Sequence, residues 1–108
     1  MTHLYDTQDK IWEWAKRKGW NDKPIPYPEQ VALIHSEVSE ALEAYRDGVI
    51  DTVKDEHGKP IGYFSELADA VIRICHYFSR EGRSLQEEID LKMAYNEERE
   101  YRHGGKEI

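Results

Sequence analysis

Apolar residues recur at steps of three and four positions in two separate stretches of this chain. In residues 29–47 they are Val31, Ile34, Val38, Ala41, Leu42 and Tyr45, and in residues 64–80 they are Phe64, Leu67, Val71, Ile74, Cys75 and Phe78. This spacing places each set on one face of an α-helix. We therefore predict two amphipathic helices, each with a face that packs in a core.

Local signals divide the rest of the chain. Residues 6–18 are predicted to form a first helix. Pro24, Pro26 and Pro28 prevent a continuous helix after it, and Pro28 suits the first turn of the second helix. Ser84 and Glu87 form a capping-box pattern that opens a fourth helix, predicted over 84–101. Residues 49–63 contain a turn signal and are predicted to form either a short β-hairpin or an irregular loop. The predicted fold class is all-α, with four helices and this one insertion.

Length and composition limit the number of domains and the size of the hydrophobic core that one chain can form. Its 108 residues suit a single domain, 1–108, with 103–108 predicted to be a flexible tail. Hydrophobic residues make up 39% and charged residues 34%, so a chain this short buries a limited core. We therefore expect a homo-oligomer in which dimerisation completes the helical bundle.

Charge and hydropathy narrow the range of partners. The formal net charge of −7 disfavours binding to nucleic acid polymers, which usually requires a basic face. No apolar run approaches the length of a membrane span, and we recognise no signal-peptide pattern. We expect no membrane partner and a cytoplasmic location.

Two pairs of carboxylates stand out on the two amphipathic helices. Glu37 and Glu40 belong to the second helix, and Glu66 and Asp69 belong to the third. Within each pair the side chains lie about 60° apart around the helix, beside the apolar face. Four converging carboxylates need a counter-charge, and their oxygens suit Mg²⁺, with Mn²⁺ as a substitute. Spacing alone leaves open the alternative of a solvated acidic face.

The local sequence resembles the MazG-like, all-α NTP pyrophosphohydrolases. The resemblance rests on residues 36–41 (SEVSEA), residues 66–72 (ELADAVI), Lys59-Pro60-Ile61-Gly62, and the spacing of Lys92, Asn96 and Arg99 ahead of 102–106. It implies hydrolysis of a (d)NTP to the monophosphate and pyrophosphate. It also implies Mg²⁺ bound by Glu37, Glu40, Glu66 and Asp69, and a dimer or a dimer of dimers.

The resemblance also suggests substrate contacts on the fourth helix. A stripe about 80° wide changes from apolar to polar along that helix if it continues far enough: Leu85, Ile89, Lys92, Asn96, Arg99 and His103. We interpret Lys92 and Arg99 as triphosphate ligands that stabilise charge during cleavage, and Asn96 as a ligand of phosphate or sugar. Lys92 and Asn96 match family positions that contact the nucleotide. The general base is either Glu37 or Glu40.

Other site residues have two interpretations each. Arg102, His103 and Lys106 either close over the phosphates or form a basic tail. Arg73 stands where some relatives carry a tyrosine near the substrate, and it pairs either with a motif carboxylate or with a phosphate. Three tryptophans either stack on a base or pack in a core or dimer contact: Trp12, Trp14 and Trp20.

Two other functions remain open from the sequence. One is hydrolysis of another nucleotide, such as an alarmone or phosphoribosyl-ATP. The other is a non-catalytic helical dimerisation module whose carboxylates hold a structural ion.

Overall fold

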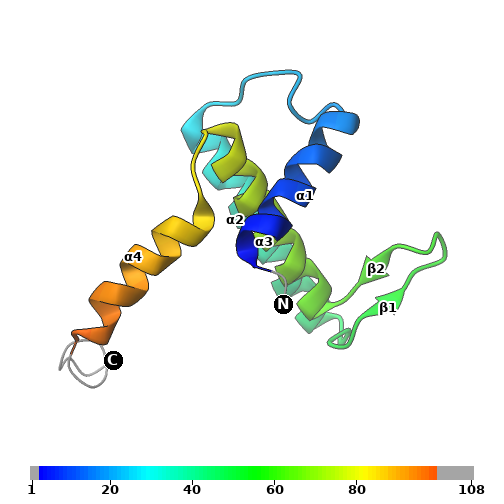
Figure 1. Ribbon diagram of the computed structural model, residues 1–108. Coiled ribbons are helices and arrows are strands. Elements are labelled where there is room, and N and C mark those ends of the chain that lie inside the picture. The colour runs from blue at the N-terminus through cyan, green and yellow to red at the C-terminus, as the bar shows by residue number, and fades with distance from the viewer. Residues whose placement is uncertain (1–2, 100–108) are drawn as a thin grey trace.

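The computed structural model describes residues 3–99, which form four helices and one small sheet (Figure 1). The helices are α1 (Leu4–Arg17), α2 (Tyr27–Arg46), α3 (Tyr63–Arg80) and α4 (Leu85–Glu97). Strands β1 (Val53–Lys54) and β2 (Pro60–Ile61) pair between α2 and α3. The prediction of a mostly helical fold with one insertion is confirmed.

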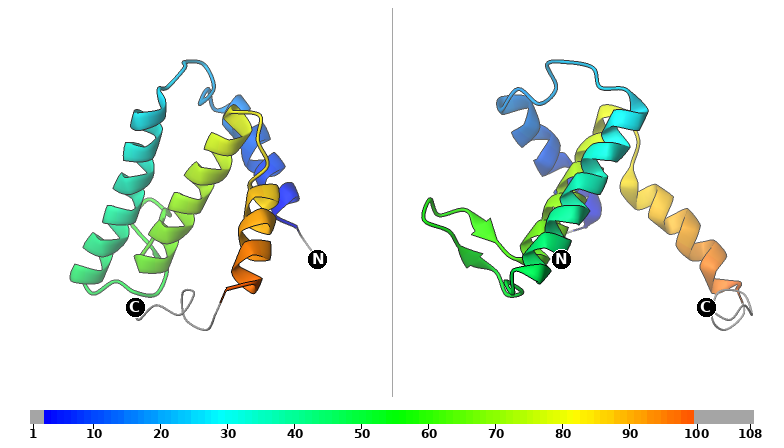
Figure 2. Two further views of the ribbon diagram at one scale, coloured as in Figure 1. Left: turned by 90° about the vertical axis from the view of Figure 1, so that its left-hand side faces the viewer. Right: turned by 180° about the vertical axis from the view of Figure 1, so that it is seen from behind.

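The helices α2 and α3 lie side by side and antiparallel, and they form the largest helix–helix contact (Figure 2). Helix α1 packs across α3, and α4 contacts α1 while its far end points away from the α2–α3 pair (Figures 1 and 2). Residues of α2 and α3 that face each other therefore come together in the middle of the molecule. None of the helices within residues 3–99 is long and apolar enough to cross a membrane.

The α1–α2 connection is held by the end of α3. Pro28 occupies the first turn of α2, as predicted, where its missing N–H is not needed. Arg80, in the last turn of α3, donates hydrogen bonds to the backbone carbonyls of Trp20 and Lys23. The proline-rich segment thus has fixed partners, although it cannot be helical.

The segment between α2 and α3 is an antiparallel β-hairpin, so the irregular-loop alternative is wrong. Val53 pairs with Ile61, and Lys54 pairs with Pro60. In the turn, Asp55 Oδ1 accepts hydrogen bonds from the N–H groups of His57 at 2.8 Å and Lys59 at 2.9 Å. These bonds satisfy the turn backbone and fix the register of a very short ladder.

The fourth helix begins as predicted but ends earlier. The Ser84 hydroxyl accepts a hydrogen bond from the Glu87 N–H at 3.2 Å, which is one half of the predicted capping box. Helix α4 ends at Glu97, with Glu98 as its C-cap. The prediction of a helix over 84–101 is therefore wrong at residues 98 and 99, and residues 100 and beyond lie outside the described range.

The buried hydrophobic side chains of the described residues are all small. Ala15, Ala41, Ala70 and Cys75 are buried, which confirms Cys75 as a core residue. Much of the predicted core face is uncovered within one chain. On α2 it forms an exposed stripe: Val31 (45% exposed), Val38 (48%), Leu42 (49%) and Tyr45 (61%). On α3 it continues at Phe64 (60%) and Val71 (47%).

The expectation that these residues form a core is therefore only partly met in one chain. The physical reason is the course of α4, which runs away from the α2–α3 pair instead of covering it (Figure 2). We call the six residues Val31, Val38, Leu42, Tyr45, Phe64 and Val71 the open stripes.

Candidate metal centre

Three carboxylates converge where α2 faces α3. Glu37 and Glu40 extend from α2 and Glu66 from α3, and each offers an oxygen within 4.8 Å of the others. Glu66 is buried, Glu37 is half-buried and Glu40 is exposed. Asp69 lies one turn after Glu66 and lines a cavity together with Glu37, but it is outside the three-carboxylate cluster. The structure thus brings together three of the four predicted ligands and places the fourth beside them.

One oxygen of the buried Glu66 carboxyl group lacks a hydrogen-bond partner among the described residues. This oxygen is Oε2, and the residue is 7% exposed. Burial raises the pKa of Glu66, and the negative charges of Asp69 and Glu40 raise it further. A buried carboxylate without a donor is costly, and a bound divalent cation would remove that cost. The site therefore fits a hard cation with oxygen ligands.

Arg73 from α3 pairs with the first of these carboxylates. Its Nε donates a hydrogen bond to Glu37 Oε1 at 2.9 Å, and the two side chains are 30% and 14% exposed. The guanidinium carbon also lies 5.2 Å from the centroid of the Trp20 ring, within the range of a cation–π interaction. Of the two sequence interpretations of Arg73, pairing with a motif carboxylate is the one observed.

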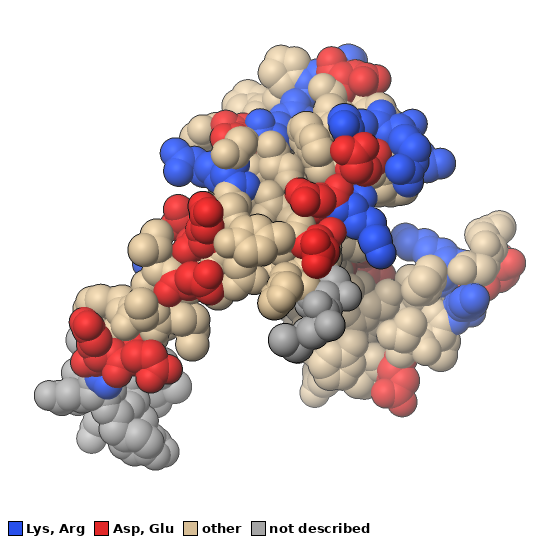
Figure 3. All heavy atoms as spheres, in the orientation of Figure 1, with Lys and Arg blue, Asp and Glu red and all other residues tan. Residues whose placement is uncertain are grey.

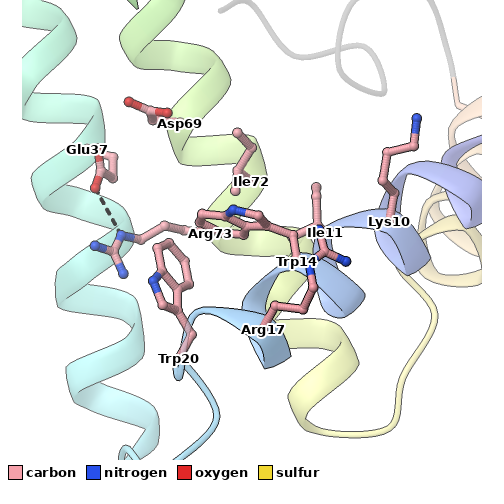
Figure 4. Close-up of a pocket in the computed structure, with 9 residues that line it drawn as sticks. All are labelled: Lys10, Ile11, Trp14, Arg17, Trp20, Glu37, Asp69, Ile72 and Arg73. Carbon is pink, nitrogen blue, oxygen red and sulfur yellow. Dashed lines mark hydrogen bonds and ion pairs between the residues drawn. The ribbon is translucent and has the colours of Figure 1, made fainter. Parts of the chain in front are cut away.

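A cavity of about 590 Å³ opens beside the carboxylates, between α1 and the α2–α3 pair. Ile11, Trp14, Trp20 and Ile72 give it an apolar and aromatic wall, and Lys10, Arg17 and Arg73 add positive charge. In Figure 4, Glu37 and Asp69 lie at one side of the cavity and the α1 side chains lie at the other. The cavity therefore combines aromatic surface, cations and two predicted metal ligands.

Two of the three tryptophans line this cavity. The rings of Trp14 and Trp20 meet edge to face, with centroids 4.6 Å apart. Trp12 instead lies against His76, at a centroid distance of 5.8 Å. Base stacking thus stays a prediction for Trp14 and Trp20, while Trp12 has the packing role that was its alternative.

Lys10 and Arg17 were not among the predicted site residues. They lie outside the motifs, on the first predicted helix. One signal was available, because Lys10, Ile11, Trp14 and Arg17 follow the three-and-four spacing of one helix side, which mixes aromatic and basic residues. At the end of α1 this basic character is visible on the molecular surface, whereas acidic side chains are spread along α4 (Figure 3).

The predicted ligands on α4 are not beside the carboxylates within one chain. Lys92 lines a separate hollow together with Phe78, Leu85 and Ile89. Asn96 and Arg99 are exposed, and Arg99 lies past the end of α4, with its guanidinium 5.7 Å from the Tyr95 ring centroid. Their contacts with substrate stay predictions, as do those of Arg102, His103 and Lys106, which lie outside the described residues.

Comparison with known proteins adds no information about the function of this site. No family model, curated protein or solved structure matches the chain. Membership of the MazG-like family therefore stays a prediction from the motifs, and function has to be argued from the site itself.

Proposed function

We propose that the carboxylate cluster binds Mg²⁺ and that the chain hydrolyses a nucleoside triphosphate to the monophosphate and pyrophosphate. The observation that supports this most is Glu66 Oε2, a buried carboxylate oxygen without a hydrogen-bond partner among the described residues. It belongs to a cluster of three carboxylates, one of which, Glu37, lines a cavity with basic and aromatic walls together with Asp69. In this proposal Glu37, Glu40 and Glu66 are metal ligands, and Asp69 is the fourth.

The cavity suits a nucleoside with an attached polyphosphate. Its volume of about 590 Å³ is in the usual range for small-molecule sites. Trp14 and Trp20 offer ring faces and edges to a base, and base–aromatic stacking tolerates any base. Arg73, which lies beside Glu37, would offset phosphate charge that an acidic chain otherwise repels. The proposed orientation places the base toward Trp14 and the phosphates toward Glu37 and Asp69.

The chemistry requires a water molecule, a base and charge stabilisation. Bound Mg²⁺ would neutralise phosphate charge and lower the pKa of a water molecule. Glu40 is the preferred general base, because it is the exposed member of the cluster and has no ion pair in the described part of the chain; one of its oxygens would bind the cation while the other accepts the proton. Arg73 would stabilise the charge that develops on the phosphates.

The proposed enzyme acts as a dimer. The open stripes leave apolar side chains of α2 and α3 in solvent, and burying them against a second copy would stabilise both chains. Helix α4 points away from the carboxylates of its own chain (Figure 1). Dimerisation would therefore allow Lys92 and Asn96 to lie beside the carboxylates of the partner chain. In this arrangement α4 of one chain reaches the cavity of its partner.

A substrate panel tests the proposed activity. The chain is incubated with Mg²⁺ and each of the common NTPs and dNTPs, with an alarmone and with phosphoribosyl-ATP, while pyrophosphate and orthophosphate are assayed separately. Pyrophosphate release from a triphosphate supports the proposal. Release of orthophosphate alone refutes the cleavage position. Turnover of only the alarmone or phosphoribosyl-ATP refutes the substrate class, and cation binding without any turnover favours a non-catalytic module.

Two glutamates on α2 provide a matched pair of variants. Glu40→Gln should lower the rate at least about 100-fold, the usual scale for loss of a catalytic base. Glu43→Gln, one turn further along α2, removes an exposed carboxylate that pairs with Arg46 and should leave the rate unchanged. Equal effects of the two substitutions would remove Glu40 from the proposed site.

A further inference from the structure

The ion pair between Arg73 and Glu37 occupies one of the proposed metal ligands. Arg73 Nε donates to Glu37 Oε1 at 2.9 Å, so this oxygen already has a positively charged partner. Figure 4 shows the bond spanning from α3 to α2 beside Asp69 and Trp20. A cation that binds to Glu37 has to compete with this guanidinium group.

The charge of Arg73 also acts on the rest of the cluster. A guanidinium keeps its charge at every physiological pH, so it repels a cation nearby whatever the conditions. Both side chains are largely shielded from water, so the repulsion is less screened than at the surface. In the free protein, Arg73 therefore lowers the affinity of the three carboxylates for a lone divalent cation.

A polyphosphate would be a better partner for Arg73 than Glu37 is. The planar guanidinium fork binds phosphate oxygens in pairs. Arg73 lines the cavity together with Glu37 and Asp69, so a phosphate held there would be within reach of its side chain. Stacking on Trp20 would keep the guanidinium at the cavity wall during the exchange.

We propose that Arg73 is a positioning residue that links cation binding to phosphate binding. It holds Glu37 while the cavity is empty and exchanges Glu37 for a phosphate when a cation–polyphosphate complex enters. The exchange frees Glu37 for the cation at the moment the phosphate arrives. The site thus favours the complex over the lone cation. This inference rests on the proposed function, because it assumes that the carboxylates bind a cation and the cavity binds a polyphosphate.

If Arg73 has only a structural role, the expected effect of its substitution differs from the effect that the linkage predicts. If Arg73 only tied α2 to α3, its loss would disorder Glu37 and weaken every ligand. The linkage predicts effects of opposite sign in a variant that lacks Arg73. Compared with the wild type, this variant binds a lone cation more tightly and a cation–polyphosphate complex more weakly.

The test is calorimetric titration of the full chain with Mn²⁺ alone and with the Ca²⁺ complex of inorganic triphosphate. Arg73→Met should bind Mn²⁺ roughly threefold to tenfold more tightly than the wild type, because a nearby positive charge is gone. It should bind the Ca²⁺–triphosphate complex at least about fivefold more weakly, because the guanidinium fork is lost. Arg46→Met removes the same charge from an exposed position on α2 and should change neither affinity.

Further variants keep the test decisive. Arg73→Gln replaces Arg73→Met if the latter does not fold, as judged by circular dichroism. Arg73→Lys keeps the charge without the fork, so it should bind Mn²⁺ like the wild type and triphosphate more weakly. If Arg73→Met weakens or does not change Mn²⁺ binding, while Glu40→Gln abolishes it, the linkage is refuted and the metal site stands. If neither the wild type nor any variant binds Mn²⁺, the metal site and the linkage both fail.

Discussion

The N–H group of Leu85 donates a hydrogen bond of 2.9 Å to the side-chain oxygen of Gln8, 77 positions earlier in the chain. The amide nitrogen of Gln8 donates to the Arg83 carbonyl and to the Ser79 hydroxyl, each at 2.8 Å. Gln8 is 7% exposed. One buried side-chain amide thus forms hydrogen bonds with polar groups at the end of α3 and at the start of α4. These bonds hold α1 against both helices.

Replacing this amide should destabilise the fold. Gln8→Leu keeps the volume but leaves the Leu85 N–H and the Arg83 carbonyl without their partner, so we expect a loss of about 2–4 kcal/mol in the free energy of unfolding. Gln86→Leu is the matched control, because the only bond its amide makes to a described side chain is an exposed one to Asp90. Urea denaturation followed by circular dichroism measures both. Equal losses in the two variants would contradict the role given to Gln8.

Gly62 fixes the start of α3 through a close backbone contact. Its φ is 130°, and a Cβ atom added there would lie 2.7 Å from the carbonyl oxygen of Asp51. Gly62→Ala should cost about 2–3 kcal/mol, since it combines a strained conformation with a backbone clash. Gly58→Ala has a positive φ of 79° but no atom within 4 Å, so it should cost only about 1 kcal/mol. Thermal melting of both variants tests the difference, and a smaller loss in Gly62→Ala would contradict the clash.

The sequence was sufficient to predict the helices, because their apolar spacing, prolines and caps act locally. Pro28 and Ser84 open α2 and α4 as predicted, and Cys75 is buried. Helix spacing placed Glu37, Glu40 and Glu66 beside the apolar faces but left open a solvated acidic face, and it is the structure that brings the three together.

Other features depend on the relative positions of helices, which local periodicity does not encode. The apolar stripe containing Val38 and Leu42 was predictable, but that α4 leaves it uncovered was not. The sequence did not determine the partner of Arg73, because a carboxylate and a phosphate both attract a guanidinium group. Lys10 and Arg17 join the site only because α1 crosses α3.

His76 should make stability depend on pH. Burial lowers the pKa of its imidazole, and the positive charges of Arg80 and Arg73 lower it further. The Nε2 of His76 lies 2.6 Å from Asn21 Oδ1, an acceptor, so the neutral ring donates this bond. Below the ordinary pKa of about 6.5 the unfolded chain binds a proton that the folded chain does not. Stability contributed by His76 is therefore present above that pH and is lost as the pH falls toward the lowered value.

The variant His76→Gln isolates this effect, because glutamine can donate to Asn21 but does not titrate. Between pH 7 and pH 5 the wild type should lose more unfolding free energy than His76→Gln, as measured by urea denaturation at each pH. Parallel curves for the two proteins would show that His76 is not protonated on unfolding in this range.

Cation binding should stabilise the wild type through Glu66. A cation at a hundred times its Kd raises the free energy of unfolding by about 2.7 kcal/mol. Without a cation, Glu66→Gln should be more stable than the wild type at pH 7, because it removes a buried charge whose neighbours repel it. Thermal melting with and without Mn²⁺ measures both effects. A variant that gains as much from Mn²⁺ as the wild type would remove Glu66 from the ligand set.

A charge placed in the open stripes should break the proposed dimer. Leu42 is 49% exposed in one chain, and Leu42→Glu would place a carboxylate in an apolar interface. We expect a monomer by sedimentation equilibrium and a loss of activity if α4 serves the partner site. His57→Glu adds a negative charge on the exposed turn of the hairpin and should leave the mass unchanged. A monomeric wild type at micromolar concentration would contradict the dimer.

Phosphorus NMR of a single reaction tests the central proposal most directly. The wild-type chain is mixed with Mg²⁺ and the best triphosphate of the panel, and the spectrum is followed with time. The proposal predicts that nucleoside monophosphate and pyrophosphate appear together in equal amounts, that excess EDTA stops the reaction, and that Glu40→Gln slows it at least about 100-fold. A diphosphate with orthophosphate as products, or a triphosphate that stays intact with every base, would contradict it.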